Sequence, residues 1–127
     1  MKSGRWNILI LLWAGWICLG IGWPAPARTA EPPPVLPQLL EFDRKLCPVC
    51  KASERVILAV KDAYPGQFAV TKLYIDEAEP LFRRYQVAIV PTQVFLDRAG
   101  KEVYRHYGVF KTPELIEKLR ELKFIRD

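Results

Sequence analysis

The chain has 127 residues, half of them hydrophobic, and a formal net charge of +5. This length is enough for one domain with a hydrophobic core. Three of the five net charges come from Lys2, Arg5 and Arg28, since residues 1–30 contain no acid, which leaves two for residues 31–127. Basic and acidic residues are interspersed in this larger part, which argues against the clustered basic stripe of a nucleic-acid-binding surface.

Residues 1–30 have the pattern of a secretory signal peptide or an N-terminal membrane anchor. A positive flank precedes an apolar run over about residues 8–22, and small residues follow. This order is typical of a signal peptide, and we expect cleavage after Ala27 or Ala30. The run is also close to the length of a short membrane span, with tryptophans near both ends, so an uncleaved anchor is the alternative. Both interpretations place the rest of the chain outside the cytoplasm.

Residues 31–37 form a proline-rich linker that favours extended polyproline conformation, and residues 38–127 form the predicted domain. Residues 38–46 are expected to contain a strand and its exit loop. Pro48 suits the first position of a helix, because its missing N–H is not needed there, and apolar residues then recur at helical spacing. Residues 68–75 are apolar on both faces apart from two polar positions, which predicts a central strand.

The second half of the domain is predicted to hold a short helix, a hairpin and a last helix. Residues 76–85 form the short helix, and residues 93–96 and 101–107 pair as antiparallel strands. Thr112-Pro113 is expected to cap the last helix and to put proline at its first position. Gly108 is placed where the backbone needs close approach or a positive φ.

The order β-α-β-α-β-β-α predicts an α/β fold. We expect a four-stranded mixed sheet whose first two strands are parallel and whose last two form the hairpin. Helices would cover both faces of this sheet.

Cys47 and Cys50 form the chemically distinctive pair of the domain. A thiolate at a helix N-terminus faces unpaired backbone N–H groups and the positive end of the helix dipole, and both lower its pKa. Cys50 lies one turn further on, close enough to close a small disulfide ring. The alternatives are a static disulfide or half of a zinc site, for which His106 is the only other strong ligand. We expect His106 to have a surface or packing role, and Cys18 to be apolar filler.

The domain resembles the thioredoxin family over about residues 39–122. Residues 40–51, LEFDRKLCPVCK, resemble the family's strand and active-site loop, and residues 70–76 resemble its next strand. Residues 85–92, YQVAIVPT, resemble the segment that carries the family's cis-proline. A CxxC motif where a strand meets a helix, with Val-Pro-Thr about forty residues later, is a specific combination.

The chain departs from the family pattern at three places. The extra N-terminal strand and helix of full-length members are lacking, since only the linker precedes Leu39. Leu46 and Asp43 stand where aromatic residues are usual. These departures concern the recognition surface and the redox potential more than the fold.

The resemblance implies thiol–disulfide exchange. Cys47 would be the exposed nucleophile that attacks a substrate disulfide, and Cys50 would then resolve the mixed disulfide. Glu41, six residues before Cys47, takes the place of the family's buried acid and would shuttle a proton to or from Cys50. The alternative for Glu41 is an exposed strand charge. Lys72 is expected either to contact Glu41 or to be solvated.

Pro91 takes the place of the cis-proline that faces the disulfide. A cis bond there would bring the Val90 backbone beside the cysteines, where an extended substrate segment can pair as a short strand. The alternative is an ordinary trans proline at the start of a strand. The expected substrate contacts are Pro48, Val49, Val90 and Thr92.

The segment Pro48-Val49 contains no histidine, which the strong oxidants of the superfamily carry between their cysteines. Weaker thiolate stabilisation implies a more reducing couple, so we expect a monomeric reductase of protein disulfides outside the cytoplasm. It would be soluble in the periplasm or anchored to the inner membrane through its N-terminal segment alone. No cofactor other than the Cys47–Cys50 disulfide, no metal and no nucleic acid is expected.

The resemblance also implies a membrane thiol-transfer protein as electron donor, because no flavin or nicotinamide site is visible in the sequence. The resemblance makes cytochrome c maturation one candidate client pathway. The alternative function is a redox-inert binding module of the same fold, in which the disulfide is structural.

Overall fold

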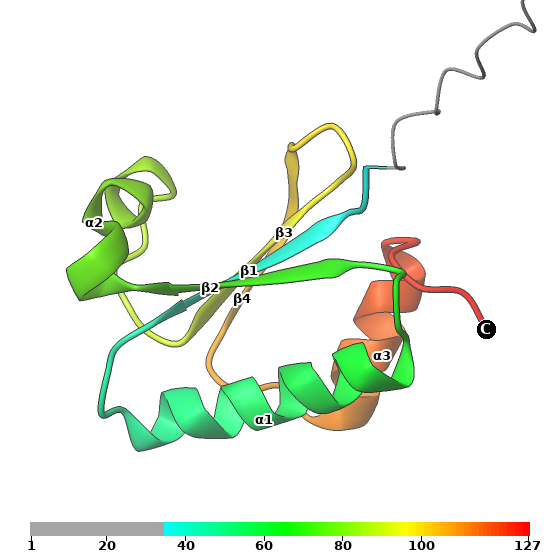
Figure 1. Cartoon of the computed structure of the whole chain (residues 1–127), viewed down its shortest axis with the longest axis horizontal. Helices are drawn as coiled ribbons and strands as arrows, with labels where there is room; N and C mark the ends of the chain where they lie inside the picture. The colour runs from blue at the N-terminus through cyan, green and yellow to red at the C-terminus, as the bar shows by residue number, and fades with distance from the viewer. Residues whose placement is uncertain (1–34) are drawn as a thin grey trace, which may run out of the picture. The chain divides into compact units, whose positions relative to one another are not determined.

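The computed structural model describes residues 35–127 (Figure 1). Its elements are β1 (Gln38–Asp43), α1 (Pro48–Ala63), β2 (Ala69–Tyr74), α2 (Ile75–Arg84), β3 (Thr92–Leu96), β4 (Glu102–Tyr107) and α3 (Thr112–Glu121). This order is the predicted one. The proposed signal or anchor, residues 1–30, lies outside the described residues, as does most of the linker. Among the residues described, no helix combines the length and apolar character needed to cross a membrane.

The four strands form one mixed sheet in the order β2-β1-β3-β4. β1 runs parallel to β2 and antiparallel to β3, and β3 and β4 form an antiparallel hairpin, as predicted. Phe42 pairs with Thr92, so the C-terminal end of β1 lies beside the N-terminal end of β3. This register brings the loop before Cys47 and the segment around Pro91 to the same end of the sheet.

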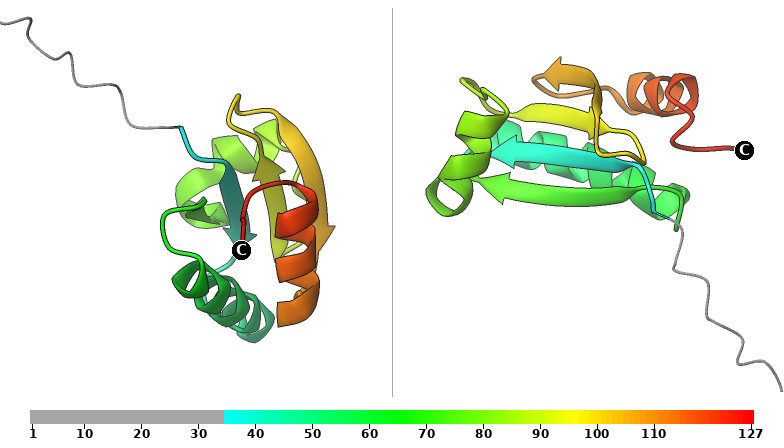
Figure 2. Two further views of the ribbon diagram at one scale, coloured as in Figure 1. Left: turned by 90° about the vertical axis from the view of Figure 1, so that its right-hand side faces the viewer. Right: turned by 90° about the horizontal axis from the view of Figure 1, so that it is seen from above.

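Helices cover both faces of the sheet. α1 and α3 lie on one face, and α2 lies on the other near one end of the strands (Figures 1 and 2). Leu39 and Phe95 of the sheet face α1 and α3, where they pack with Ile57 of α1 and Leu115 of α3 in the larger core. Because side chains alternate along a strand, the adjacent Leu40 and Phe42 face the opposite way, into the smaller core beneath α2.

The prediction that residues 68–75 form a central strand is wrong. β2 lies at an edge of the sheet, and its residues are only partly buried. Its two-sided apolar pattern has another cause, since Val70 packs against the α1 and α3 core while Leu73 packs against the α2 core. The interior strands are β1, in which five of six residues are buried, and β3, in which all five are.

The prediction for the start of the last helix is wrong by one residue. Lys111, rather than Thr112, is the N-cap, and its extended backbone precedes a helix that begins at Thr112 with Pro113 in its first turn. Glu114 accounts for this shift, because its carboxylate accepts a hydrogen bond from the Lys111 backbone N–H at 3.4 Å. This contact satisfies a donor at the helix start from within the first turn.

Candidate redox site

A disulfide joins Cys47 and Cys50 at the start of α1, with their Cα atoms 5.3 Å apart. Cys47 is the N-cap of α1, and its sulfur accepts a hydrogen bond from the Cys50 backbone N–H at 3.2 Å. Pro48 begins the helix, as predicted. Cys47 is half-buried, whereas Cys50 is only 2% exposed. Another protein can therefore reach the Cys47 side of the disulfide more readily than the Cys50 side.

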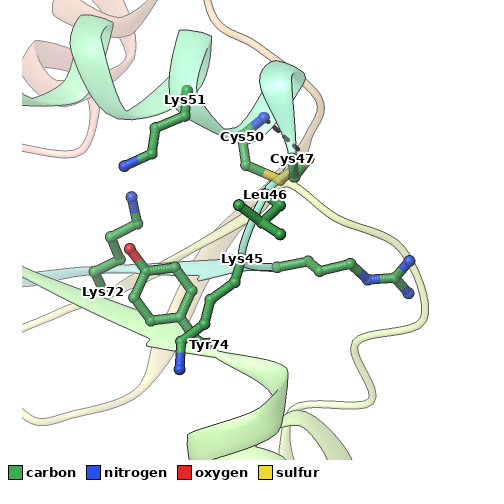
Figure 3. Close-up of a pocket in the computed structure, with 8 residues that line it drawn as sticks. Lys45, Leu46, Cys47, Cys50, Lys51, Lys72 and Tyr74 are labelled. Atoms are coloured by element: carbon green, nitrogen blue, oxygen red, sulfur yellow. Dashed lines mark hydrogen bonds between the residues drawn. A yellow bond between two sulfur atoms is a disulfide. The ribbon is translucent and has the colours of Figure 1, made fainter.

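The disulfide borders a hollow of about 420 Å³. Arg44, Lys45, Leu46, Cys47, Cys50, Lys51, Lys72 and Tyr74 line it (Figure 3). Leu46, at the position where the resemblance leads us to expect an aromatic residue, is 99% exposed and has a φ of 58°. Val49, on the other side of Cys47, is 53% exposed. Exposed apolar side chains thus flank the more accessible cysteine.

A layer of buried polar side chains lies between the sheet and α1. Glu41 and Asp43 are 1% and 0% exposed, and they share one face of β1 because they are two residues apart. Ser53 of α1 and Gln93 of β3 are also buried, and the Gln93 amide donates a hydrogen bond to the Ser53 hydroxyl at 2.9 Å. The alternative of an exposed Glu41 is therefore wrong.

Burial raises the pKa of Glu41 to about 7, and a hydrogen bond with Ser53 opposes this rise. The expected contact between Lys72 and Glu41 is not made. The Lys72 ammonium instead lies 3.2 Å from an Asp43 carboxylate oxygen and 2.8 Å from a Glu54 carboxylate oxygen. Burial raises the pKa of Asp43, and its ion pair with Lys72 counteracts this effect.

Sequence reasoning missed Asp43 as a buried acid. The signal was present, because an acid two residues after Glu41 in the same strand must share its face. The resemblance draws attention to Asp43 only as the replacement of an aromatic residue. Its zero exposure and its ion pair with Lys72 place it in the polar layer beneath α1.

The Val90–Pro91 peptide bond is cis, so the alternative of an ordinary trans proline is wrong. The Gly108 backbone N–H donates to the Pro91 carbonyl at 2.9 Å, and Gly108 has the positive φ that we expected, 91°. Thr92 is fully buried, and its hydroxyl donates to the Ile89 carbonyl at 2.7 Å. The Thr92 side chain therefore shapes the loop and is closed to a substrate, contrary to its predicted contact.

His106 has the packing role that we expected. Its ring stacks on Phe110, with ring centroids 3.6 Å apart and planes inclined by 20°. Within residues 35–127, no group of three or more His, Cys, Asp or Glu side chains is arranged to hold a metal ion. The described part of the chain therefore offers no ligand set for the zinc alternative.

Residues 35–123 match the family model of a thioredoxin-like domain. Thioredoxin-1 of Drosophila melanogaster is 34% identical over 58 residues, a match that covers 46% of this chain and 54% of that protein. The chain thus spans about half the length of this curated relative.

Solved structures show the same fold. The germline-specific thioredoxin Deadhead of Drosophila has a TM-score of 0.61 at 27% identity, covering 69% of this chain and 82% of that one. Thioredoxin-2 of a malaria parasite has a TM-score of 0.64 at 21% identity, covering 68% and 82%. Chloroplastic thioredoxin z also gives 0.64, at 22% identity, covering 70% and 80%. The chain therefore combines this fold with a disulfide at the start of α1.

Proposed function

Since the chain belongs to the thioredoxin-like family, we propose that it is a thiol–disulfide oxidoreductase that acts on other proteins through Cys47 and Cys50. The observation that carries this proposal is the unequal exposure of the two cysteines in a disulfide at a helix start. Cys47 is half-buried beside exposed apolar side chains, whereas Cys50 is enclosed. A nucleophile must meet its partner, and a resolving thiol need only reach the nucleophile.

Reduction of a client would proceed in two exchanges. The Cys47 thiolate attacks one sulfur of the client disulfide, so that the client S–S bond breaks, a mixed disulfide forms and one client thiolate leaves. The Cys50 thiolate then attacks the Cys47 sulfur and releases the second client thiolate. Two electrons pass to the client, and the Cys47–Cys50 disulfide forms.

Glu41 would manage the proton of Cys50. Cys50 must lose its proton before it attacks, and a buried carboxylate with a pKa of about 7 is matched to accept a proton near neutral pH. Reverse transfer would occur when the disulfide is reduced again. The hollow that Cys50 lines would give this proton a route to solvent.

The client segment would lie across the exposed rim around Cys47. Pro48 and Val49 are exposed on one side of the disulfide. The backbone of Val90, before the cis Pro91, would pair with an extended client segment as a short strand. This mode uses main-chain hydrogen bonds, so it suits clients of varied sequence.

The proposed direction is reduction outside the cytoplasm, with a membrane thiol-transfer protein as electron donor. The absence of histidine between the cysteines supports the direction, and the signal-like pattern of residues 1–30 supports the location. The domain would act as a monomer, with its own dithiol as the only redox group. We keep cytochrome c maturation as one candidate client pathway.

Trapping experiments test the exchange reaction. A Cys50→Ser variant is expected to accumulate mixed disulfides with client proteins, because Cys47 still attacks and nothing resolves the product. Mass spectrometry of the trapped species would identify the clients. A Cys47→Ser variant is the matched control and should trap none.

A redox-inert module with a structural disulfide would behave differently. Neither serine variant would then trap a client, and the native protein would not accelerate the reduction of insulin disulfides by dithiothreitol. That combination of results would contradict the oxidoreductase proposal.

A further inference from the structure

Four side chains of alternating charge lead from the neighbour of Cys50 into the polar layer beneath α1. The Lys51 ammonium lies 2.9 Å from one Glu54 carboxylate oxygen, and the Lys72 ammonium lies 2.8 Å from the other. Lys72 also lies 3.2 Å from Asp43. Figure 3 shows the Lys51 and Lys72 side chains pointing toward one another beside the hollow that Cys50 lines.

Lys72 is the cation that pairs with the buried carboxylate of Asp43. Asp43 has no exposed surface, and an ionised carboxylate in such a place needs a partner of opposite charge. Among residues 35–127, Lys72 is the only cation within ion-pair distance of Asp43 or Glu41. Its side chain is 19% exposed, so it also connects the polar layer to the solvent.

Glu41 is left without a cation of its own. The charged groups that face it are Asp43 of the same strand, Glu54 of α1 and Lys72 of β2. Its neutral neighbour Ser53 comes from α1, and Gln93 of β3 bonds to Ser53. Asp43 lies two residues along β1, about 7 Å away by the rise of a strand. Asp43 therefore repels a negative charge on Glu41 and at the same time holds the cation that would stabilise it.

We propose that Asp43 is a positioning residue that, by holding Lys72, sets how firmly Glu41 holds its proton, and thereby the pH range in which Cys50 resolves a mixed disulfide. This inference rests on the proposed function. When Cys50 attacks, its thiol proton passes to the Glu41 carboxylate, leaving a thiolate and a neutral acid, and no other reactant is needed. Because Lys72 pairs with Asp43, Glu41 is the buried acid that has no cation beside it.

The two positions predict shifts of opposite sign. Asp43→Asn removes a repelling charge and releases Lys72, so the pH midpoint of Cys50 attack should fall by about one unit or more. Lys72→Met removes the cation, so the midpoint should rise by about the same amount. The measurement is the rate at which Cys50 resolves a preformed mixed disulfide on Cys47 in the full chain, between pH 5 and 9, a window of about two units on either side of the expected midpoint.

Lys51→Met is the matched control, because Lys51 also pairs with Glu54 but lies within ion-pair distance of neither buried acid, and its charge is not among those that act on Glu41. Its midpoint should stay at the native value. Glu41→Gln should abolish the midpoint, because the titrating group is gone. A loss of rate in the Asp43 and Lys72 variants with no movement of the midpoint, or movement of both in the same direction, overturns the inference.

A second measurement keeps the test independent of activity. Titration of the Glu41 carboxyl in the oxidised protein, followed by infrared difference spectroscopy against Glu41→Gln, should show the same opposite shifts. This readout survives a failure of the proposed function, since it needs no client. If the native protein resolves no mixed disulfide but the carboxyl shifts appear, the oxidoreductase proposal fails, while the effect of Asp43 on the proton of Glu41 holds. If Lys72→Met does not fold, Lys72→Gln replaces it with the same expected sign.

Discussion

The Glu41 carboxyl group is almost fully buried in the folded chain. Its free energy of ionisation therefore differs between the folded and the unfolded chain. Burial raises its pKa from 4.5 to about 7 on folding. The folded chain thus binds this proton more tightly than the unfolded chain does. The stability that the folded chain gains from binding this proton is fully present below pH 4.5 and is lost as the pH rises through about 7.

This linkage predicts the stability of a Glu41→Gln variant. The native domain should lose about 3 kcal/mol of its free energy of unfolding between pH 4.5 and pH 8 through this group. Glu41→Gln should remove most of that loss and should be the more stable protein at pH 8. Urea unfolding at the two pH values measures the effect.

An exposed acid supplies the control for this measurement. Glu79 on α2 pairs with Arg83 in solvent, where both side chains are more than half exposed. Glu79→Gln should therefore leave the native pH dependence unchanged. If Glu41→Gln behaves as Glu79→Gln does, the raised pKa of Glu41 is wrong.

At the scale of elements, Gly108 directly follows β4 and is hydrogen-bonded to the loop that carries the cis-proline. Its φ is 91°, a conformation that residues with a side chain rarely adopt, and its N–H donates to the Pro91 carbonyl. No atom would obstruct a Cβ at this position. The effect of a substitution therefore comes from backbone conformation rather than from a clash.

Gly108→Ala should cost about 1 kcal/mol of stability, because alanine is strained at this φ. It should also slow client reduction, since the strained backbone shifts the Pro91 carbonyl and with it the proposed client-binding strand. Thermal unfolding and an insulin reduction assay measure the two effects.

Gly100 is the matched control for Gly108. It has a φ of 77°, also with open space around it, but it lies in the β3–β4 turn, where its N–H bonds to Asp97. Gly100→Ala should lose similar stability and keep native activity at a temperature where both variants are folded. Equal activity in the two variants would remove Gly108 from the client-binding region.

At the scale of the whole molecule, the domain of residues 38–127 follows a signal-like segment and a proline-rich linker. The proposal of action outside the cytoplasm therefore predicts export. Protein purified from the producing cell should begin at Arg28 or Glu31 if the segment is cleaved, or at Met1 in the membrane fraction if it is an anchor.

Mass spectrometry of the intact protein from periplasmic, membrane and cytoplasmic fractions distinguishes these outcomes. A chain that lacks residues 1–30 is the control and should stay in the cytoplasm. Native protein that also stays in the cytoplasm, with Met1 in place, would contradict export in either form.

Features that depend on a few neighbouring residues were predictable from the sequence. The helix start at Pro48 follows from a missing N–H, and the positive φ of Gly108 follows from its missing side chain. The order of the elements follows from the periodicity of apolar residues. The positions of Cys47 just before α1 and of Cys50 in its first turn follow from the helix start at Pro48. The resemblance to a family added the cis bond at Pro91, which no local rule requires.

Only the tertiary structure decided which groups meet. The position of β2 at an edge depends on β1 pairing with β3, a contact between residues fifty or more positions apart. The partner of Lys72 depends on the distance between β2 and α1, which is set by packing in the core, and it proved to be Asp43 and Glu54 rather than Glu41. Local sequence rules act over about one helical turn, so they identify reactive residues but do not determine which distant charge lies beside them.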